Sequence, residues 1–399
     1  MDEHRQSFSN MVLVVCFLAI LTAPSVCNFL GIEPHPIQGD RVAFLHARPI
    51  SESSWEKLKS NIGGDYGLRG TLLYAHGLME DHLLKTNQNG VLFGKEGWKF
   101  MNREGVLEYT QRVQPYTPQD IMIVLQQLQT NQGICRRYDV DYVRCIAPNK
   151  STIYPEYLPD WVEGAHPQSR FEQLLASDNS IVEELLPDTR IPLLEEKVHH
   201  QVYFKADSHW NSRGAVVTLN TLYNHLNSYG IHEYPFIEWD SFEEKCYLME
   251  PDLHRFMGLF SGYEATDCLP GFPHFEENPI VYNFPESVSS DSGARFPQTV
   301  KEFSNKLRYT TYAWNPAANV KNRRVVLVGD SFAEYLPPLL KHHFSEVVFI
   351  HEWELPIPEL FLERFEPKLL IELSAERKLL TSPHILFSSE VSESQGGVK

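Results

Sequence analysis

The sequence predicts an α/β fold with a mostly parallel central sheet. Near the C-terminus, three short apolar runs alternate with two helical segments: 325–328, 333–343, 347–350, 358–365 and 369–373. Strands that alternate with helices imply parallel pairing through right-handed crossovers. Ser331 follows the first apolar run, and open α/β sheets place their chemistry at the carboxyl ends of such strands.

A helix–strand unit upstream extends this pattern. Thr117 is a helix N-cap, Pro118 fits the first helical position, and Gly133 is the expected end of the helix. A strand is expected over 140–147, and Pro148 ends it.

A second unit follows the same order. A helical segment over 170–186 leads to an expected strand over 202–204, which delivers Asp207 and His209 into a loop. The next expected helix covers 213–226. Both chemistry-bearing motifs are therefore expected at strand ends.

The chain divides by composition into segments of different kinds. The first 27 residues hold one basic residue and then an apolar stretch, which is typical of a signal peptide or an uncleaved membrane anchor. In either case the body is exported, periplasmic or secreted. The remaining expected segments are an extended lead-in over 28–54, one domain over 55–382 with an irregular insertion at 231–320, and a disordered tail over 383–399.

Composition and charge exclude one class of partner. The 399 residues are 42% hydrophobic and 12% aromatic, as in a globular protein with a sizeable core. The net charge is −17, from 35 basic and 52 acidic residues. Because nucleic-acid binding needs a basic face, no nucleic-acid partner is expected.

Four cysteines lie beyond the N-terminal segment: Cys135, Cys145, Cys246 and Cys268. An even number in an exported chain permits disulfides. Cys246 and Cys268 share one loop-rich region and are the better-placed pair. Cys135 and Cys145 could close a local loop, or Cys145 is a buried apolar residue on its strand. None has the spacing of a zinc site, so no metal is expected.

Two motifs hold the residue types of a serine nucleophile and its base. A serine hydroxyl needs a base to remove its proton, and His209 could do so for Ser331 while Asp207 orients the imidazole. The alternative is a turn serine and a capping aspartate beside a half-exposed histidine. His199 and His200 are nearby competitors without a flanking motif.

Further candidates for an oxyanion hole or for substrate binding lie at strand ends or inside the two motifs: Gly329, Arg377, Ser374, Asn149, Lys150, Tyr154 and Trp210. Arg377 could instead form a structural ion pair with Glu376. Asp330 could be a second catalytic carboxylate, but adjacent residues on a turn diverge, which favours a structural role in the loop.

Several blocks together resemble a known family, the alginate O-acetyltransferase-like branch of the SGNH hydrolase superfamily. In that branch an Asp-x-His-Trp motif precedes the Gly-Asp-Ser motif. The resemblance covers roughly residues 40 to 380 and rests on these blocks: Asp65-Tyr66-Gly67-Leu68-Arg69, Val91 to Trp98, Ala147-Pro148-Asn149-Lys150, Asp207-Ser208-His209-Trp210, and Gly329-Asp330-Ser331-Phe332. The family commonly has Thr where Ala206 or Ser208 stands.

The resemblance implies a fold, an activity and partners. The fold is a three-layer sandwich with a circularly permuted motif order. The activity is O-acetyl transfer through acetyl-Ser331, with His209 and Asp207 completing a triad and no bound cofactor. The acceptor is a polysaccharide such as alginate, and a membrane-bound acyltransferase delivers the acetyl group. An acetylesterase with the same triad and a non-catalytic polysaccharide-binding relative are the alternatives, and no oligomeric state is predicted.

Overall fold

The computed structural model describes residues 69–85, 90–230, 234–259, 265–270, 281–284, 310–314, 320–352, 355–380 and 386–388, with scattered residues between Met11 and Val26. The expected boundaries at residues 27, 54 and 382 lie outside these ranges, as does the block at 65–68. Within the described ranges, no helix combines the length and apolar character that a bilayer crossing needs.

The chain groups into two compact units. The first comprises residues 1–93 and 249–265, and the second comprises 94–248 and 266–399. The described elements of the first unit are helix α4 (Arg69–Met79), the π-helix η1 (Glu80–Leu84), strand β1 (Val91–Phe93) and helix α12 (Asp252–Phe256). Both motifs singled out from the sequence lie in the second unit.

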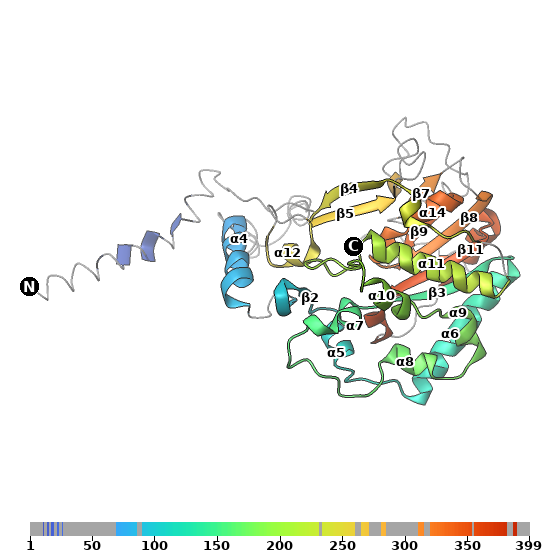
Figure 1. Cartoon of the computed structure of the whole chain (residues 1–399), viewed down its shortest axis with the longest axis horizontal. Helices are drawn as coiled ribbons and strands as arrows, with labels where there is room; N and C mark the ends of the chain where they lie inside the picture. The colour runs from blue at the N-terminus through green and yellow to red at the C-terminus, as the bar shows by residue number, and fades with distance from the viewer. Residues whose placement is uncertain are drawn as a thin grey trace, which may run out of the picture. The chain divides into compact units, whose positions relative to one another are not determined.

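The second unit is built on a six-stranded sheet in the order β3-β11-β8-β9-β7-β6. The strands are β3 (Asp141–Ala147), β11 (Leu369–Ala375), β8 (Val320–Gly329), β9 (Phe344–His351), β7 (Thr310–Trp314) and β6 (Val281–Phe284). The first four pair in parallel, and β7 and β6 extend the sheet antiparallel (Figure 1). The predicted α/β fold with a mostly parallel sheet is therefore confirmed.

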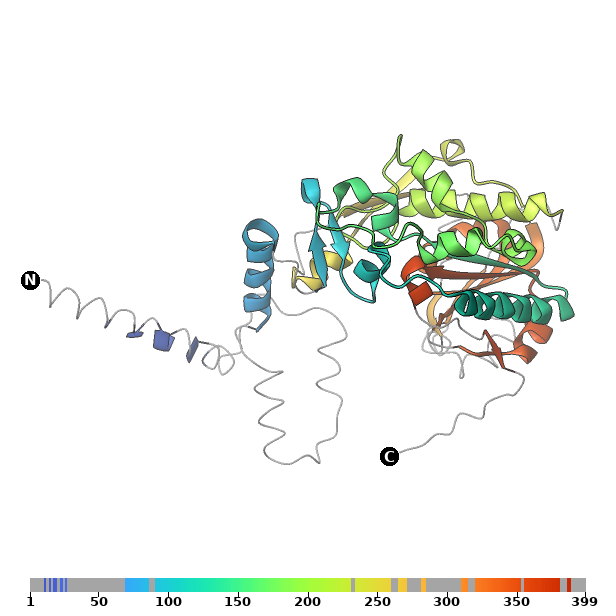
Figure 2. The same ribbon diagram turned by 90° about the horizontal axis from the view of Figure 1, so that it is seen from below.

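Helices cover both faces of this sheet. Helices α6 (Pro118–Arg137) and α11 (Ser212–Ser228) lie on opposite sides of it (Figure 2). Successive side chains of a strand point to opposite faces, and Val326 and Val328 of β8 share one core cluster with Val124 and Leu128 of α6. These four side chains are at most 3% exposed, so burial of apolar area holds the layers together.

Helix α6 starts where the sequence predicts and ends later. Thr117 and Asp120 form a capping box, with Pro118 at the first helical position. The predicted end at Gly133 is wrong, because the helix continues to Arg137. Cys135 of this added turn is fully buried, so the packing gain offsets the poor helix propensity of glycine.

The segment between β3 and α11 differs from the prediction. Two short helices replace the single one expected over 170–186: α8 (Arg170–Leu175) and α9 (Ser180–Leu185). A third short helix, α10 (Arg190–Glu196), follows them. The strand expected over 202–204 is wrong, since only one bridge forms there, between Tyr203 and Trp210. The chain reverses directly after it, which leaves no length for a ladder.

Two regions expected to lack regular structure contain strands. Residues 231–320 include β4 (Glu244–Met249), β5 (Ala265–Pro270), β6 and β7, of which the last two belong to the central sheet. The tail after residue 383 contains β12 (Phe387–Ser388), which pairs in parallel with β10 (Ile357–Pro358). Leu386 is fully buried in the core, which explains why these residues are ordered.

The remaining elements of the second unit are short. They are η2 (Lys95–Gly97), β2 (Lys99–Met101), α5 (Val106–Thr110), α7 (Lys150–Ile153), η3 (Pro155–Tyr157), η4 (Trp239–Ser241), η6 (Ala333–Tyr335), α14 (Pro337–His343), α15 (Glu359–Phe365) and η8 (Glu376–Leu380).

The cysteines follow the favoured prediction. Cys246 and Cys268 form a disulfide that links β4 to β5. Cys135 and Cys145 are free and buried, so the alternative bridge between them is wrong and both act as small apolar core residues.

Gly329 allows β8 and β11 to pack closely at their carboxyl ends. A Cβ atom at this position would lie 2.3 Å from the Leu373 carbonyl oxygen and 2.7 Å from Cβ of Ala333. We expect Gly329→Ala to lower the free energy of unfolding by about 1–3 kcal/mol through overpacking, measured by urea denaturation.

Gly133→Ala is the matched control, because a Cβ there meets nothing within 4 Å. We expect it to raise the free energy of unfolding by about 0.5–1 kcal/mol, since alanine favours the helix. If Gly329→Ala and Gly133→Ala change the free energy of unfolding equally, the structure can accommodate a Cβ atom at residue 329, and the close packing there does not require glycine.

Candidate active site

The structure brings Ser331, His209 and Asp207 into one hydrogen-bonded chain. His209 Nε2 lies 2.7 Å from Ser331 Oγ, and His209 Nδ1 lies 2.7 Å from Asp207 Oδ1. The Asp207 side chain is buried and the His209 side chain is 14% exposed, so substrate can reach the far end of the chain while the carboxylate stays dry. This is the order of contacts that a nucleophile, a base and an orienting carboxylate require.

The aspartate determines which ring nitrogen carries the hydrogen. An ionised carboxylate only accepts hydrogen bonds, so Nδ1 of His209 must donate to Asp207. In the neutral imidazole Nε2 is then the acceptor, and it faces the Ser331 hydroxyl. The same Asp207 oxygen also accepts the His209 backbone N–H at 2.9 Å, which explains how residues two apart can both serve one site.

The loop that carries the pair is a tight reversal. The Phe204 N–H donates to the His209 carbonyl at 3.3 Å, and the Asn211 N–H donates to the Val202 carbonyl at 3.1 Å. Helix α11 begins directly afterwards, with Asn211 accepting from the Gly214 N–H as its N-cap. Asp207 and His209 are thus held between a closed loop and a helix start.

Lys150 ties this loop to the end of β3. Its buried ammonium donates to the carbonyl oxygens of Phe204, Lys205 and Asp207, at 3.0, 3.1 and 2.6 Å. The Nζ atom also lies 5.3 Å from the ring centroid of Phe100. Lys150 is a candidate for substrate binding, but these contacts make it the clamp of the loop that carries Asp207 and His209.

Asp330 holds the turn that presents the nucleophile. Its buried carboxylate accepts the Phe332 N–H at 3.0 Å and the Ala375 N–H at 2.7 Å. Burial raises the pKa of this group, although Arg377 and the two amides oppose that shift. The carboxylate therefore joins the turn after β8 to the end of β11, as expected for a structural role, and it withdraws the Phe332 amide from any oxyanion hole.

Arg377 and Glu376 do not pair with each other, so the alternative of a structural ion pair between them is wrong. Arg377 donates from Nε to Glu104 at 2.9 Å, and its guanidinium carbon lies 5.7 Å from the Phe332 ring centroid. Glu376 is fully buried and accepts from Tyr109 at 3.0 Å. Residues adjacent on a short helix point apart, and each finds a partner far away in the sequence.

The remaining candidates are buried around the site. Tyr154 accepts the Val202 N–H at 3.0 Å, and Trp210 is fully buried with its ring 5.0 Å from that of Phe332. The side chains of Asn149 and Ser374 are also buried, and Asn149 Nδ2 and Ser374 Oγ have no hydrogen-bond partner among the described residues. In this conformation these four side chains support the site rather than line its opening.

Sequence reasoning did not find Asp267, which supports the start of α11. Its buried carboxylate accepts from Ser212 Oγ at 2.6 Å, from the Ser212 N–H and from Tyr247 at 2.9 Å. The neighbouring Cys268 forms the disulfide, so the β4–β5 ribbon fixes the helix that follows His209. The cysteine at 268 was the one sequence signal near this residue.

Comparisons with known proteins point to one family. A family described as the SGNH hydrolase-like domain of the acetyltransferase AlgX matches residues 91–261. This stretch includes Asp207 and His209 and ends before Ser331. The resemblance to the alginate O-acetyltransferase family is thereby confirmed.

Two curated proteins that are similar to this chain have names that refer to the same activity. The probable alginate O-acetylase AlgJ of Azotobacter vinelandii is 27% identical over 172 residues, which is 41% of this chain and 39% of that protein. The protein of the same description from Pseudomonas putida is 25% identical over 162 residues, covering 38% and 37%. The matches thus span about two fifths of the length of these relatives.

A solved structure is also similar. The O-acetyltransferase domain of Pseudomonas putida AlgJ aligns with a TM-score of 0.43 and 19% identity, covering 73% of this chain and 92% of that domain.

The Lys150 clamp predicts a loss of serine reactivity. Lys150→Met leaves three buried carbonyl oxygens without their donor and frees the loop. We expect labelling of Ser331 by phenylmethylsulfonyl fluoride to slow roughly 10- to 100-fold, because small misplacements of a base are costly. Intact-protein mass spectrometry measures the rate, normalised to the folded fraction from circular dichroism.

Lys205→Met is the matched control. Lys205 Nζ also lies over the Trp98 ring, at 5.9 Å, but it donates to the Glu96 carbonyl outside the loop. We expect its labelling rate to equal that of the parent protein. A Lys150→Met protein that labels as fast as the control would contradict the clamp.

The Asp330 bridge predicts a loss of stability. An asparagine side chain would offer one acceptor oxygen where two amides now donate to two, so Asp330→Asn leaves one buried N–H unpaired. We expect the free energy of unfolding to fall by about 1–3 kcal/mol in urea denaturation. Asp240→Asn, at an exposed position, is the control and should leave the free energy of unfolding unchanged. An unchanged free energy of unfolding in Asp330→Asn would contradict the proposed bridge.

Proposed function

We propose that this chain is an exported carbohydrate O-acetyltransferase that moves an acetyl group through acetyl-Ser331 onto polysaccharide hydroxyls. The observation that carries the proposal is the hydrogen-bonded chain from Ser331 through His209 to Asp207. The match to an acetyltransferase domain family supports acetyl as the group transferred.

The first half-reaction acylates the serine. His209 Nε2 takes the hydroxyl proton as Ser331 Oγ attacks the acetyl carbonyl of the donor, and a tetrahedral oxyanion forms. When it collapses, the bond to the leaving group breaks and the imidazolium returns the proton to that group. Asp207, 2.7 Å behind the ring, stabilises the transient positive charge.

The second half-reaction transfers the acetyl group. An acceptor hydroxyl takes the place of the leaving group and gives its proton to His209 Nε2 as it attacks acetyl-Ser331. Collapse of this intermediate releases the acetylated sugar and returns the proton to Ser331 Oγ. With water as the attacking group, the same residues would hydrolyse the acetyl-enzyme, so exclusion of water from the acceptor site separates a transferase from an esterase.

Export and partners are part of the same proposal. The apolar N-terminal segment supports entry into an export pathway, and the Cys246–Cys268 disulfide suits an oxidising compartment. The proposed acceptor is a polysaccharide, and a membrane-bound acyltransferase would supply the acetyl group.

Ser331→Ala tests the proposal with p-nitrophenyl acetate as the donor. We expect the parent protein to release nitrophenol and to gain one acetyl group on Ser331 by mass spectrometry. The variant should lose at least about 1000-fold in rate, because removing a nucleophile removes the covalent pathway. Ser208→Ala is the matched control, since Ser208 Oγ lies 3.4 Å from Nδ1 of the same ring.

The results of this experiment distinguish an O-acetyltransferase from an esterase and from a protein that does not use Ser331. Turnover that survives Ser331→Ala, or the absence of acetyl-Ser331 in the parent, would overturn the proposal. Acetate release that no polysaccharide acceptor diverts into O-acetylated product would identify an esterase.

A further inference from the structure

A cavity of about 810 Å³ lies in the second unit, away from the Ser331–His209 contact. Helices α7 and α10 line it together with the loop that leads into α8, and we refer to it as the α7–α10 cavity. Ligand pockets commonly enclose several hundred Å³, so the cavity is large enough for a sugar unit and part of its neighbour. None of the catalytic roles described above uses it.

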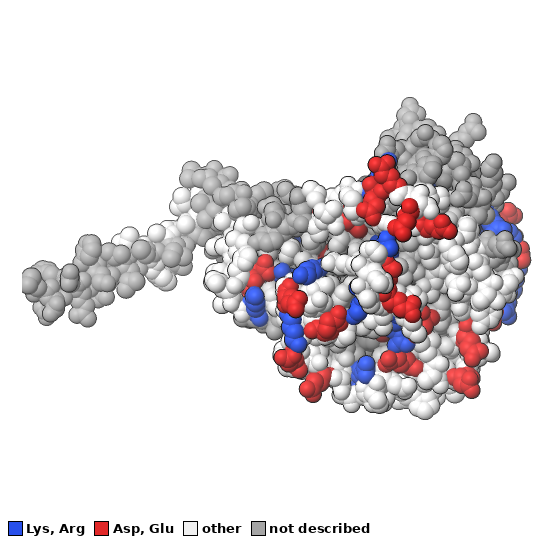
Figure 3. All heavy atoms as spheres, viewed as in Figure 1, with Lys and Arg blue, Asp and Glu red and all other residues white. Residues whose placement is uncertain are grey.

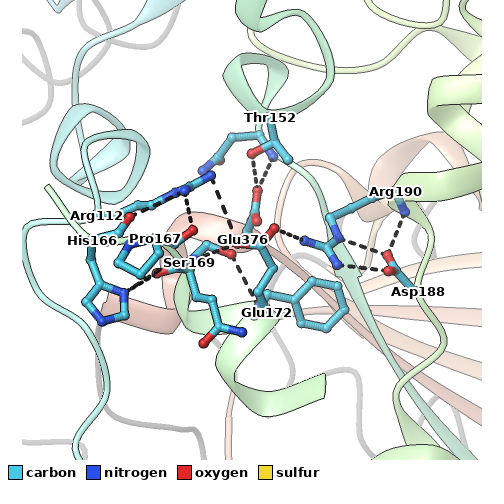
Figure 4. A network of polar contacts seen from close by, with 12 residues as sticks. Arg112, Thr152, His166, Pro167, Ser169, Glu172, Asp188, Arg190 and Glu376 are labelled. Carbon is cyan, nitrogen blue, oxygen red and sulfur yellow. Dashed lines mark hydrogen bonds and ion pairs between the residues drawn. The ribbon is translucent and has the colours of Figure 1, made fainter. Parts of the chain in front are cut away.

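Part of the cavity lining is polar. It includes Thr152 of α7, Glu172 and Asp188 (Figure 4). Ser151 of α7 also lines the cavity. Carboxylate oxygens accept several hydrogen bonds each, and hydroxyls both donate and accept. Such a set complements a ligand that presents many hydroxyl groups.

The lining also contains apolar residues that are open to solvent. Ile191 and Leu194 of α10 are 57% and 38% exposed, and the buried Leu158 lines the cavity as well. They suit the face of a sugar ring that carries hydrogens on carbon.

The arginines of the cavity are already occupied. Arg190 donates two hydrogen bonds to the Asp188 carboxylate, at 2.9 and 2.8 Å, and forms an ion pair with Glu172 at 3.1 Å. Arg112 donates to the carbonyl oxygens of His166 and Pro167 and lies 4.0 Å from Glu172 (Figure 4). Both guanidinium groups therefore bind protein groups of the cavity lining. Neither is left to form a bidentate pair with an anionic ligand.

The charge balance disfavours an acidic ligand. The two guanidinium groups are paired with the carboxylates of Glu172 and Asp188. Glu376 also lines the cavity, and burial raises the pKa of its carboxyl group. Acidic and basic side chains are also interspersed over the elements that frame the cavity, without a basic track leading to it on the face seen in Figure 3. A carboxylate on the ligand would meet like charges with no free cation in the described lining to compensate.

The cavity and the nucleophile share one edge of the sheet. Thr152 follows β3, Glu376 follows β11 and Ser331 follows β8, and these strands are consecutive and parallel. Strands lie about 4.8 Å apart, so two steps along the edge cover about 10 Å. Glu376 accepts from Thr152 and from the Asn149 N–H, which fixes the cavity wall to the edge.

We infer that the α7–α10 cavity binds a neutral, hydroxyl-rich sugar unit of the acceptor polymer and discriminates against uronate units. The inference rests on the proposed function, which makes a polysaccharide the acceptor. It narrows that acceptor to an uncharged chain, whose hydroxyls would donate to Glu172 and Asp188 while α10 covers the ring.

Calorimetric titration tests the inference on the Ser331→Ala protein, which cannot turn over. The probes are neutral tetrasaccharides of glucose, mannose, galactose and N-acetylglucosamine, with a mannuronate tetrasaccharide for comparison. We expect at least one neutral probe to bind and the uronate to bind about tenfold more weakly or not at all.

Three further variants locate the binding in the cavity. Ile191→Trp fills the opening from an exposed position and should weaken the neutral probe about tenfold or more. Val198→Trp, 74% exposed and outside the lining, is the matched control and should retain the affinity. Glu172→Gln keeps the capping box of α8 while removing a charge, and it should strengthen uronate binding.

Three outcomes would overturn the inference: no neutral probe binds, the uronate binds as tightly, or Ile191→Trp binds like the control. Failure here is distinct from failure of the proposed function. A parent protein that forms acetyl-Ser331 while no neutral probe binds keeps the function and loses the cavity assignment. If the sugar probes bind as expected but the parent protein never forms acetyl-Ser331, the cavity assignment stands and the proposed function fails.

Discussion

The parallel pairing of β11 with both β3 and β8 is the constraint on which the site depends. Leu373 of β11 lies opposite Cys145 of β3 on one side and opposite Gly329 of β8 on the other. β3 and β11 end together at the pair Ala147–Ala375, and β8 ends at Gly329, opposite Leu373. The residues that follow the three strands therefore emerge at one edge of the sheet. Ser331 and the buried Glu376 lie at the same edge of the sheet because of this register, although the α14–α15 region separates their strands in the sequence.

Buried charged groups, each bound to backbone atoms, hold that edge together. Asp330 accepts two amides, Lys150 donates to three carbonyls, and Asp267 accepts at the first turn of α11. Burying a charge without hydrogen-bond partners costs free energy, so the fold is stable only when these backbone contacts are made. They give irregular segments the rigidity that ladders give to strands, and so they fix the positions of His209 and Ser331, which lie 2.7 Å apart.

The sequence predicted the sheet well where apolar runs are long and bounded, as in β8 and β11. It also predicted that Ser331, His209 and Asp207 lie together, because their residue types occur in two compact motifs. It failed at Tyr203, since a run of three residues cannot distinguish a strand from a loop. The partner of Arg377 was out of reach too, because Glu104 lies 273 residues away. Lys150 binds carbonyl oxygens, which every residue has, so no sequence pattern marks its partners.

The place of β11 has a consequence for how the protein is made. β11 is the last strand of the central sheet in the sequence, yet it lies between β3 and β8. During synthesis, β3 is complete at Ala147, but among the described strands its one neighbour is β11, which emerges only from Leu369 onward. Closing so long a loop is slow, and an unpaired strand edge invites pairing with other chains. A premature stop late in the chain would therefore remove the middle of the sheet and leave two open edges instead of trimming an end.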